Sequence, residues 1–166
     1  MNPESIHKLY DYNYWAFERV WNCVIRLTDE QFTHNIEYSS GSIRNHVVHL
    51  MSATTRWMMR LQAVQLPLHL SFEDFPTLAI TKAKWDELRS ETLDYVNSLA
   101  QAQLDEVVSW ELPNRGIISK SPRWEILLHV ANHATDHRAQ MLAVLNQHFG
   151  VETVEQDMIF YLVEQK

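Results

Sequence analysis

Apolar residues recur at helical spacing in four long stretches of the chain, and polar or proline-containing segments separate these stretches. The pattern predicts helices over residues 6–27, 42–64, 77–101 and 122–148. Four amphipathic helices joined by short connections bury their apolar stripes when they pack against one another. We therefore expect an all-α fold, an antiparallel four-helix bundle that forms a single domain over residues 1–166.

Residues that favour helix ends stand at several of these boundaries. Ser42 is suited to cap the second helix, Pro122 to occupy the first turn of the fourth, and Gly150 to stop it. Residues 28–31 (Thr-Asp-Glu-Gln) have the spacing of a capping box and predict one further short helical turn.

Two segments depart from the helical pattern. Residues 107–112 and 117–119 flank a turn-like Pro-Asn-Arg-Gly sequence, which predicts a short hairpin before the last long helix, with a plain loop as the alternative. The apolar segment 158–163 near the end of the chain is long enough for a short helix or a strand.

Composition excludes several classes of function. The three glycines are too far apart to form a dinucleotide-binding or phosphate-binding loop or a nucleophile elbow. A net charge of -7 without a basic run argues against a nucleic-acid partner, and no apolar run is long enough to span a membrane. The single cysteine, Cys23, lies among apolar residues and is expected to be a buried thiol in a reducing compartment. We therefore expect a cytoplasmic protein.

Three histidines recur at every fourth position of the fourth predicted helix. His129, His133 and His137 rise along one side of that helix, at the edge of its apolar stripe. Two imidazoles one turn apart can bind the same metal ion. Two histidines four residues apart also occur on helices that bind no metal. A metal site would therefore need a third ligand from another part of the chain. The second helix offers His46 and His49, and its helical wheel favours His46, which lies nearer to the apolar stripe.

Several sequence motifs resemble those of the DinB/YfiT-like family, metalloenzyme-type proteins unrelated to the DNA polymerase that shares the DinB name. Residues 12–19 (Tyr-Asn-Tyr-Trp-Ala-Phe-Glu-Arg) are similar to the first-helix motif of this family, with Phe17 where asparagine is usual. Residues 27–32, 41–43 and 48–50 resemble its second block. Residues 124–138, with Asp157 and Phe160-Tyr161, resemble its C-terminal blocks. The resemblance covers nearly the whole chain.

The resemblance implies a four-helix bundle, commonly a homodimer, that holds one divalent metal ion through three histidines. Carried over to this sequence, the ligands are His49, His133 and His137, so the resemblance selects His49 where the helical wheel favours His46. Three imidazoles suit a transition metal such as Zn²⁺, Ni²⁺ or Fe²⁺ better than Mg²⁺ or Ca²⁺, which prefer oxygen ligands. The number of aromatic residues and methionines also favours a homodimer.

The resemblance further implies a metal-dependent hydrolase or a transferase that uses a low-molecular-weight thiol, with a small-molecule substrate. The alternative is a non-catalytic metal-binding bundle with a stress-response or structural role. The glutamate of a His-Glu-x-x-His peptidase is absent, because Val130 follows His129 and Ala134 follows His133. Asp136 is one candidate for a general base, but no residue is assigned a catalytic role from the sequence.

Overall fold

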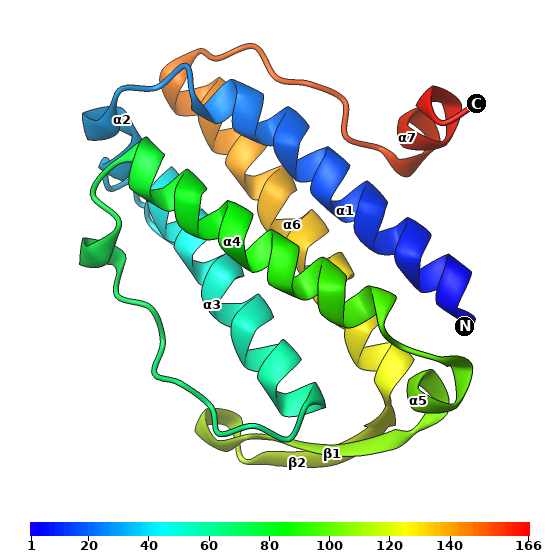
Figure 1. Cartoon of the computed structure of the whole chain (residues 1–166). Helices are drawn as coiled ribbons and strands as arrows, with labels where there is room; N and C mark the ends of the chain where they lie inside the picture. Colours follow the sequence, from blue (N-terminus) through cyan, green and yellow to red (C-terminus); the bar gives the residue numbers. More distant parts are fainter.

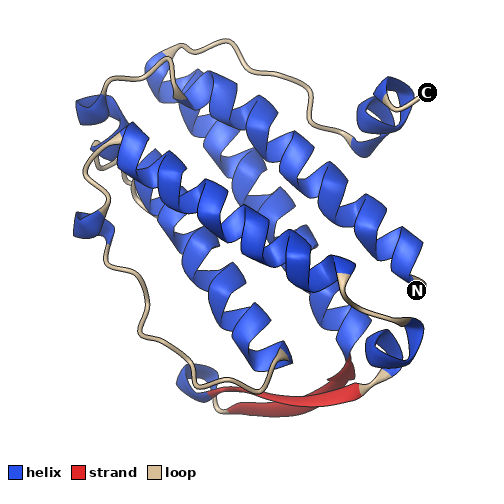
Figure 2. Ribbon diagram, viewed as in Figure 1, coloured by secondary structure: helices blue, strands red, loops and turns tan.

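Helices make up most of the structure, a computed structural model that describes all residues 1–166 (Figure 1). Four helices are long and run side by side, and a two-stranded sheet closes one end of the molecule (Figure 2). In chain order the elements are α1 (Pro3–Val24), α2 (Asp29–Thr33), α3 (Ile43–Leu61), η1 (Phe72–Asp74), α4 (Leu78–Asn97), α5 (Gln101–Asp105), β1 (Val107–Leu112), η2 (Pro113–Arg115), β2 (Ile117–Pro122), α6 (Arg123–Phe149) and α7 (Met158–Glu164).

The ends of the long helices follow from local side-chain chemistry. Asn2, Ser42 and Thr77 each accept a hydrogen bond from the backbone N–H three residues further on, which caps α1, α3 and α4. Gly150 ends α6 in the left-handed conformation. Helix α1 begins three residues before its predicted start, because Asn2 caps it and Pro3 occupies its first turn.

The short elements refine the sequence-based expectations. The predicted capping box is present at Thr28 and Gln31 and opens α2. The third predicted helix is too long, since α4 ends at Asn97 and a separate turn, α5, starts at Gln101. Between them the chain turns so that Leu99 and Leu104 are both buried. The last apolar segment forms a helix, α7, and not a strand.

The hairpin predicted before the last long helix is present, so the chain is not purely α-helical. Strands β1 and β2 pair antiparallel, with Val107 opposite Pro122 and Leu112 opposite Ile117. The turn between them contains Gly116 at φ 63°, a conformation in which glycine is not strained. The mostly helical expectation is confirmed, with this two-stranded sheet as the exception to an all-α fold.

The apolar faces of α1, α3, α4 and α6 share one core. Helix α6 packs against both α1 and α3, and α4 packs against the same two helices. The core residues of α6 include Leu127, Met141 and Leu145, none of which is exposed. Helix α7 lies outside this core and packs on α1 through Tyr161, which contacts Tyr12 and Ala16. The predicted burial of Cys23 is confirmed.

Candidate metal centre

The histidines of α3 and α6 face one another where these two helices pack together. From His129 to His137 along α6 the exposure falls: His129 is exposed, His133 is half-buried and His137 is only 9% exposed. On α3, His49 is half-buried and His46 is completely buried. The site therefore lies at the edge of the core, where an ion could be held by the protein and still be reached from outside.

His49, His133 and His137 form a group whose candidate ligand atoms all lie within 4.8 Å of one another. The Nε2 atoms of His49 and His133 are 3.3 Å apart. Two nitrogens bound tetrahedrally to one ion at about 2.0–2.1 Å would be separated by about 3.3 Å. The ring of His137 lies 4.6 Å, centroid to centroid, from the rings of both other histidines. These three side chains are thus close enough to hold a metal ion.

Two further histidines, His46 and His129, lie outside this group but contact it. His46, the residue favoured by the helical wheel, turns its Nδ1 to within 3.0 Å of the Nδ1 of His137. His129 packs its ring against His133 at 5.9 Å and against Trp57 at 5.3 Å. The structure groups His49, and not the wheel-favoured His46, with His133 and His137. A wheel drawn for one helix describes its apolar stripe and does not describe the contact between α3 and α6.

Burial keeps these imidazoles neutral near pH 7. The pKa values of His46, His133 and His137 are each lowered from 6.5 to about 4, chiefly by desolvation and further by neighbouring histidines. Desolvation also lowers the pKa of His49, with a smaller effect of the charge on His69. A neutral imidazole has a free ring lone pair, so all of these side chains are in the protonation state that metal binding requires.

Apart from neighbouring histidines, the one charged side chain that acts on His46, His133 and His137 is the carboxylate of Asp136, and two arginines of α3 lie further from the site. Arg56 and Arg60 follow His49 on the same side of α3, two and three turns further on. The guanidinium of Arg60 lies 4.9 Å above the ring of Trp57. Asp136 is an exposed carboxylate that raises the pKa of His133 and His137 against the stronger desolvation. The Nε2 of Gln140 donates a hydrogen bond to the Oδ2 of Asp136 at 3.0 Å.

A buried arginine fixes α6 beside the site. Arg138 is not exposed at all, and its guanidinium donates to the side-chain oxygens of Asn13, Thr135 and Gln156. It therefore ties α6 to α1 and to the segment before α7, directly after His137 in the sequence. The sequence showed this arginine only as part of a motif, because a charged residue is rarely expected in a core.

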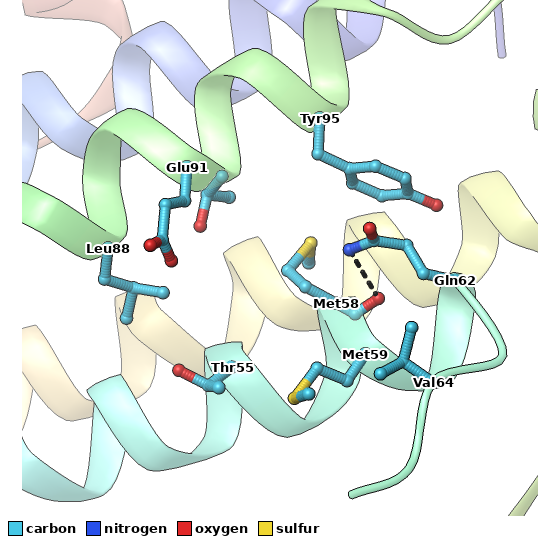
Figure 3. Close-up of a pocket in the computed structure, with 9 residues that line it drawn as sticks. Thr55, Met58, Met59, Gln62, Val64, Leu88, Glu91 and Tyr95 are labelled. Carbon is cyan, nitrogen blue, oxygen red and sulfur yellow. Dashed lines mark hydrogen bonds between the residues drawn. The ribbon is translucent and has the colours of Figure 1, made fainter. Parts of the chain in front are cut away.

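A cavity of about 470 Å³ lies elsewhere, between α3 and α4 (Figure 3). Leu88 and Glu91 of α4 face Met58 and Met59 of α3 across it. On the helical wheel Met58 lies opposite to His49, Met59 lies about 80° from it, and none of the histidines lines the cavity. The cavity is therefore separate from the histidine group.

Comparison with known proteins places the chain in a family. The DinB family model matches residues 1–165. The chain belongs to the DinB family. Among its relatives, protein DinB of Bacillus subtilis (strain 168) is 27% identical over 164 residues, which cover 96% of this chain and 94% of that protein. The uncharacterized protein YizA of the same organism is 25% identical over 136 residues, covering 81% of this chain and 82% of YizA.

The fold has a counterpart among solved structures. The crystal structure of a DinB-like protein from Bacillus cereus ATCC 10987 matches with a TM-score of 0.57 and 20% identity. The match covers 86% of this chain and 91% of that one. This likeness supports the fold and carries no assignment of activity. None of the helices combines the length and the apolar character that crossing a membrane requires.

Proposed function

We propose that this DinB-family protein is a single-domain four-helix bundle that binds one divalent transition metal ion through His49, His133 and His137. The observation that carries the proposal is the approach of three ligand atoms to within 4.8 Å of one another from two different helices. The donor set fits such an ion, because all three donors are imidazoles that burial keeps neutral. Zn²⁺, Ni²⁺ and Fe²⁺ are the candidates to test.

Metal titration of the purified protein tests this assignment. After treatment with a chelator, the wild-type protein should take up one equivalent of at least one of the three ions. His49→Ala, His133→Ala and His137→Ala should each abolish uptake while the helical circular-dichroism spectrum persists. His129→Ala is the matched control on α6, and it should keep the ion because His129 lies outside the group. Full uptake by the double variant His133→Ala, His137→Ala would refute the assignment.

We further propose that the site acts on a small molecule, either as a hydrolase or as a transferase that uses a low-molecular-weight thiol. A three-histidine ion supplies a positive charge that lowers the pKa of a bound water or thiol. The same side of α3 favours a reactant with a negative charge at its far end, because Arg56 and Arg60 lie two and three turns beyond His49. Trp57, packed against His129, offers an apolar surface for the uncharged part of the reactant.

Transfer from a thiol is the better supported of the two reactions. Hydrolysis generally needs a positioned base to accept a proton from water, and Asp136, the carboxylate that acts on these histidines, is exposed and bonded to Gln140. A thiol bound to the ion needs no such base, because the charge of the ion lowers the pKa of the thiol. Incubation of the metal-loaded protein with a small thiol and an electrophile, such as a chloro-aromatic compound or an epoxide, should give the thioether. The His133→Ala variant serves as the inactive control.

The second candidate function is non-catalytic metal binding, and the exposed position of Asp136 is what favours it. In that case the protein would retain its ion, and ion removal would change stability without any turnover of thiol or ester substrates. Metal uptake without turnover of thiol or ester substrates would favour this candidate over an enzyme.

We also propose that the protein forms a homodimer. Helix α7 leaves apolar side chains exposed, with Ile159 60%, Phe160 42% and Val163 61% accessible. Such a surface on a helix that lies outside the core is suited to pack against a second copy. Sedimentation equilibrium should give twice the monomer mass, and a monomer at high micromolar concentration would refute the proposal.

A further inference from the structure

His46 is the one side chain outside the candidate ligand group that engages a ring nitrogen of that group. Its Nδ1 lies 3.0 Å from the Nδ1 of His137, and both rings are buried. The nearest equivalent contact, between His49 and His133, joins two candidate ligands to each other. His137 is thus the only candidate ligand whose second ring nitrogen is held by another protein side chain.

The contact decides which nitrogen of His137 is available to an ion. A neutral imidazole carries one N–H, so the two facing Nδ1 atoms can share a hydrogen bond only if one is protonated and the other is not. Because the Nδ1 of His137 is occupied by this bond, its Nε2 is the atom left to bind metal. Metal at Nε2 requires a bare Nε2 and therefore a proton on Nδ1.

We propose that His46 is a positioning residue for the metal centre: its Nδ1 accepts the Nδ1–H of His137 and so presents the Nε2 lone pair of His137 to the ion. This inference rests on the proposed metal-binding function. Ligating histidines in proteins generally donate their second N–H to an acceptor that fixes the ring and its tautomer. In this chain that acceptor is a second histidine, supplied by the neighbouring helix.

The other nitrogen of His46 indicates where the protons of this pair lie in the metal-free protein. The Nε2 of His46 is buried and has no hydrogen-bond partner. A buried N–H without a partner is less common in proteins than an unpaired acceptor, so the metal-free protein favours His46 with its proton on Nδ1. His46 then donates to His137, and the proton of His137 lies on Nε2.

Metal binding reverses this arrangement without changing the number of protons on the pair. The shared proton passes from the Nδ1 of His46 to the Nδ1 of His137. The Nε2 of His137 gives its proton to solvent and binds the ion, while the Nε2 of His46 takes a proton from solvent. Each ring carries one proton before and after. The expected signature is therefore a change of tautomer at both His46 and His137.

Two substitutions of similar size separate hydrogen bonding from packing. In His46→Asn the amide oxygen can take the place of Nδ1 and accept the proton of His137. In His46→Leu the side chain is similarly branched but has no acceptor. If His46 only filled space, both variants would bind metal alike.

The test combines Zn²⁺ affinity with histidine tautomers measured by ¹⁵N nuclear magnetic resonance. Competition with a chelator should show His46→Leu binding Zn²⁺ about 10–100-fold more weakly than wild type, and His46→Asn within about threefold of it. In the wild-type protein, Zn²⁺ should move the proton of His137 to Nδ1 and that of His46 to Nε2.

Equal affinities for wild type and His46→Leu, or a loaded wild-type protein with no proton on the Nδ1 of His137, would overturn the inference and leave the proposed function standing. A wild-type protein that binds no metal would instead refute the proposed function, and the inference with it. If His46→Leu does not fold, the tautomers of the wild-type protein decide the question alone.

Discussion

The metal-free protein should lose stability as the pH falls from 7 to 5, and His46 should contribute a large part of this loss. It is not exposed to solvent, and its pKa falls from about 6.5 in an unfolded chain to about 4 in the folded protein. Between these two values the unfolded chain binds more protons than the folded one. The free energy of unfolding therefore decreases as the pH falls from 6.5 to 4, and this contribution levels off below pH 4.

The size of the effect follows from the two pKa values. Relative to pH 7, His46 alone lowers the free energy of unfolding by about 2 kcal/mol at pH 5 and by about 3 kcal/mol at pH 4. His133 and His137 act in the same direction. Their contributions do not add fully, because part of each shift arises from charge on neighbouring histidines. We expect a total loss of about 2–4 kcal/mol at pH 5.

Urea unfolding in the presence of a chelator, followed by tryptophan fluorescence at pH 7 and pH 5, measures this loss. Ordinary carboxylates titrate below this window, so they contribute little to the difference. His46→Asn is the matched control: whatever its stability at pH 7, its loss between pH 7 and pH 5 should be smaller than that of wild type. A wild-type free energy of unfolding that stays constant between the two pH values would refute the reasoning.

Two matched pairs of substitutions test the turns of the chain and the start of α6. Gly41 has φ 90°, which strains any residue with a Cβ, and a Cβ there would lie 2.7 Å from the Oδ1 of Asn35 and push that side chain aside, so Gly41→Ala should lower the free energy of unfolding by about 2 kcal/mol in urea. Gly116→Ala, at φ 63° with no atom within 4 Å of the new Cβ, should cost only about 1 kcal/mol, and an equal loss at both glycines would contradict the steric argument. Arg123 donates to the backbone oxygens of Leu61 and Gln103, to the hydroxyl of Tyr95 and to Glu106, so Arg123→Met should cost about 2–4 kcal/mol in the same assay. Glu106→Gln should cost less than about 1 kcal/mol, because that carboxylate is 57% exposed, and the opposite order would contradict the role assigned to Arg123.

The elements that could be predicted from the sequence are those that local chemistry determines. The apolar spacing and the caps at Ser42 and Gly150 predicted the long helices, and the glycine turn favoured a hairpin but left a plain loop as the alternative. The break between α4 and α5 was not predictable, because it depends on the burial of Leu99 and Leu104 against other parts of the chain. The same holds for Arg138, whose partners on α1 and before α7 lie far away in the sequence.

The choice between His46 and His49 shows most directly where local reasoning ends. A helical wheel measures how far a residue lies from the apolar stripe, and it correctly gives His46 the more buried position. Burial is not the property that selects a ligand, however, since an ion at the edge of the core needs donors that converge beside that core. His49 meets that requirement, because its Nε2 lies beside the Nε2 of His133. The more deeply buried His46 instead contacts the Nδ1 of His137. The two proposed roles, His49 as a ligand and His46 as the residue that orients His137, therefore rest on the packing of α3 on α6, which a helical wheel of one helix does not contain.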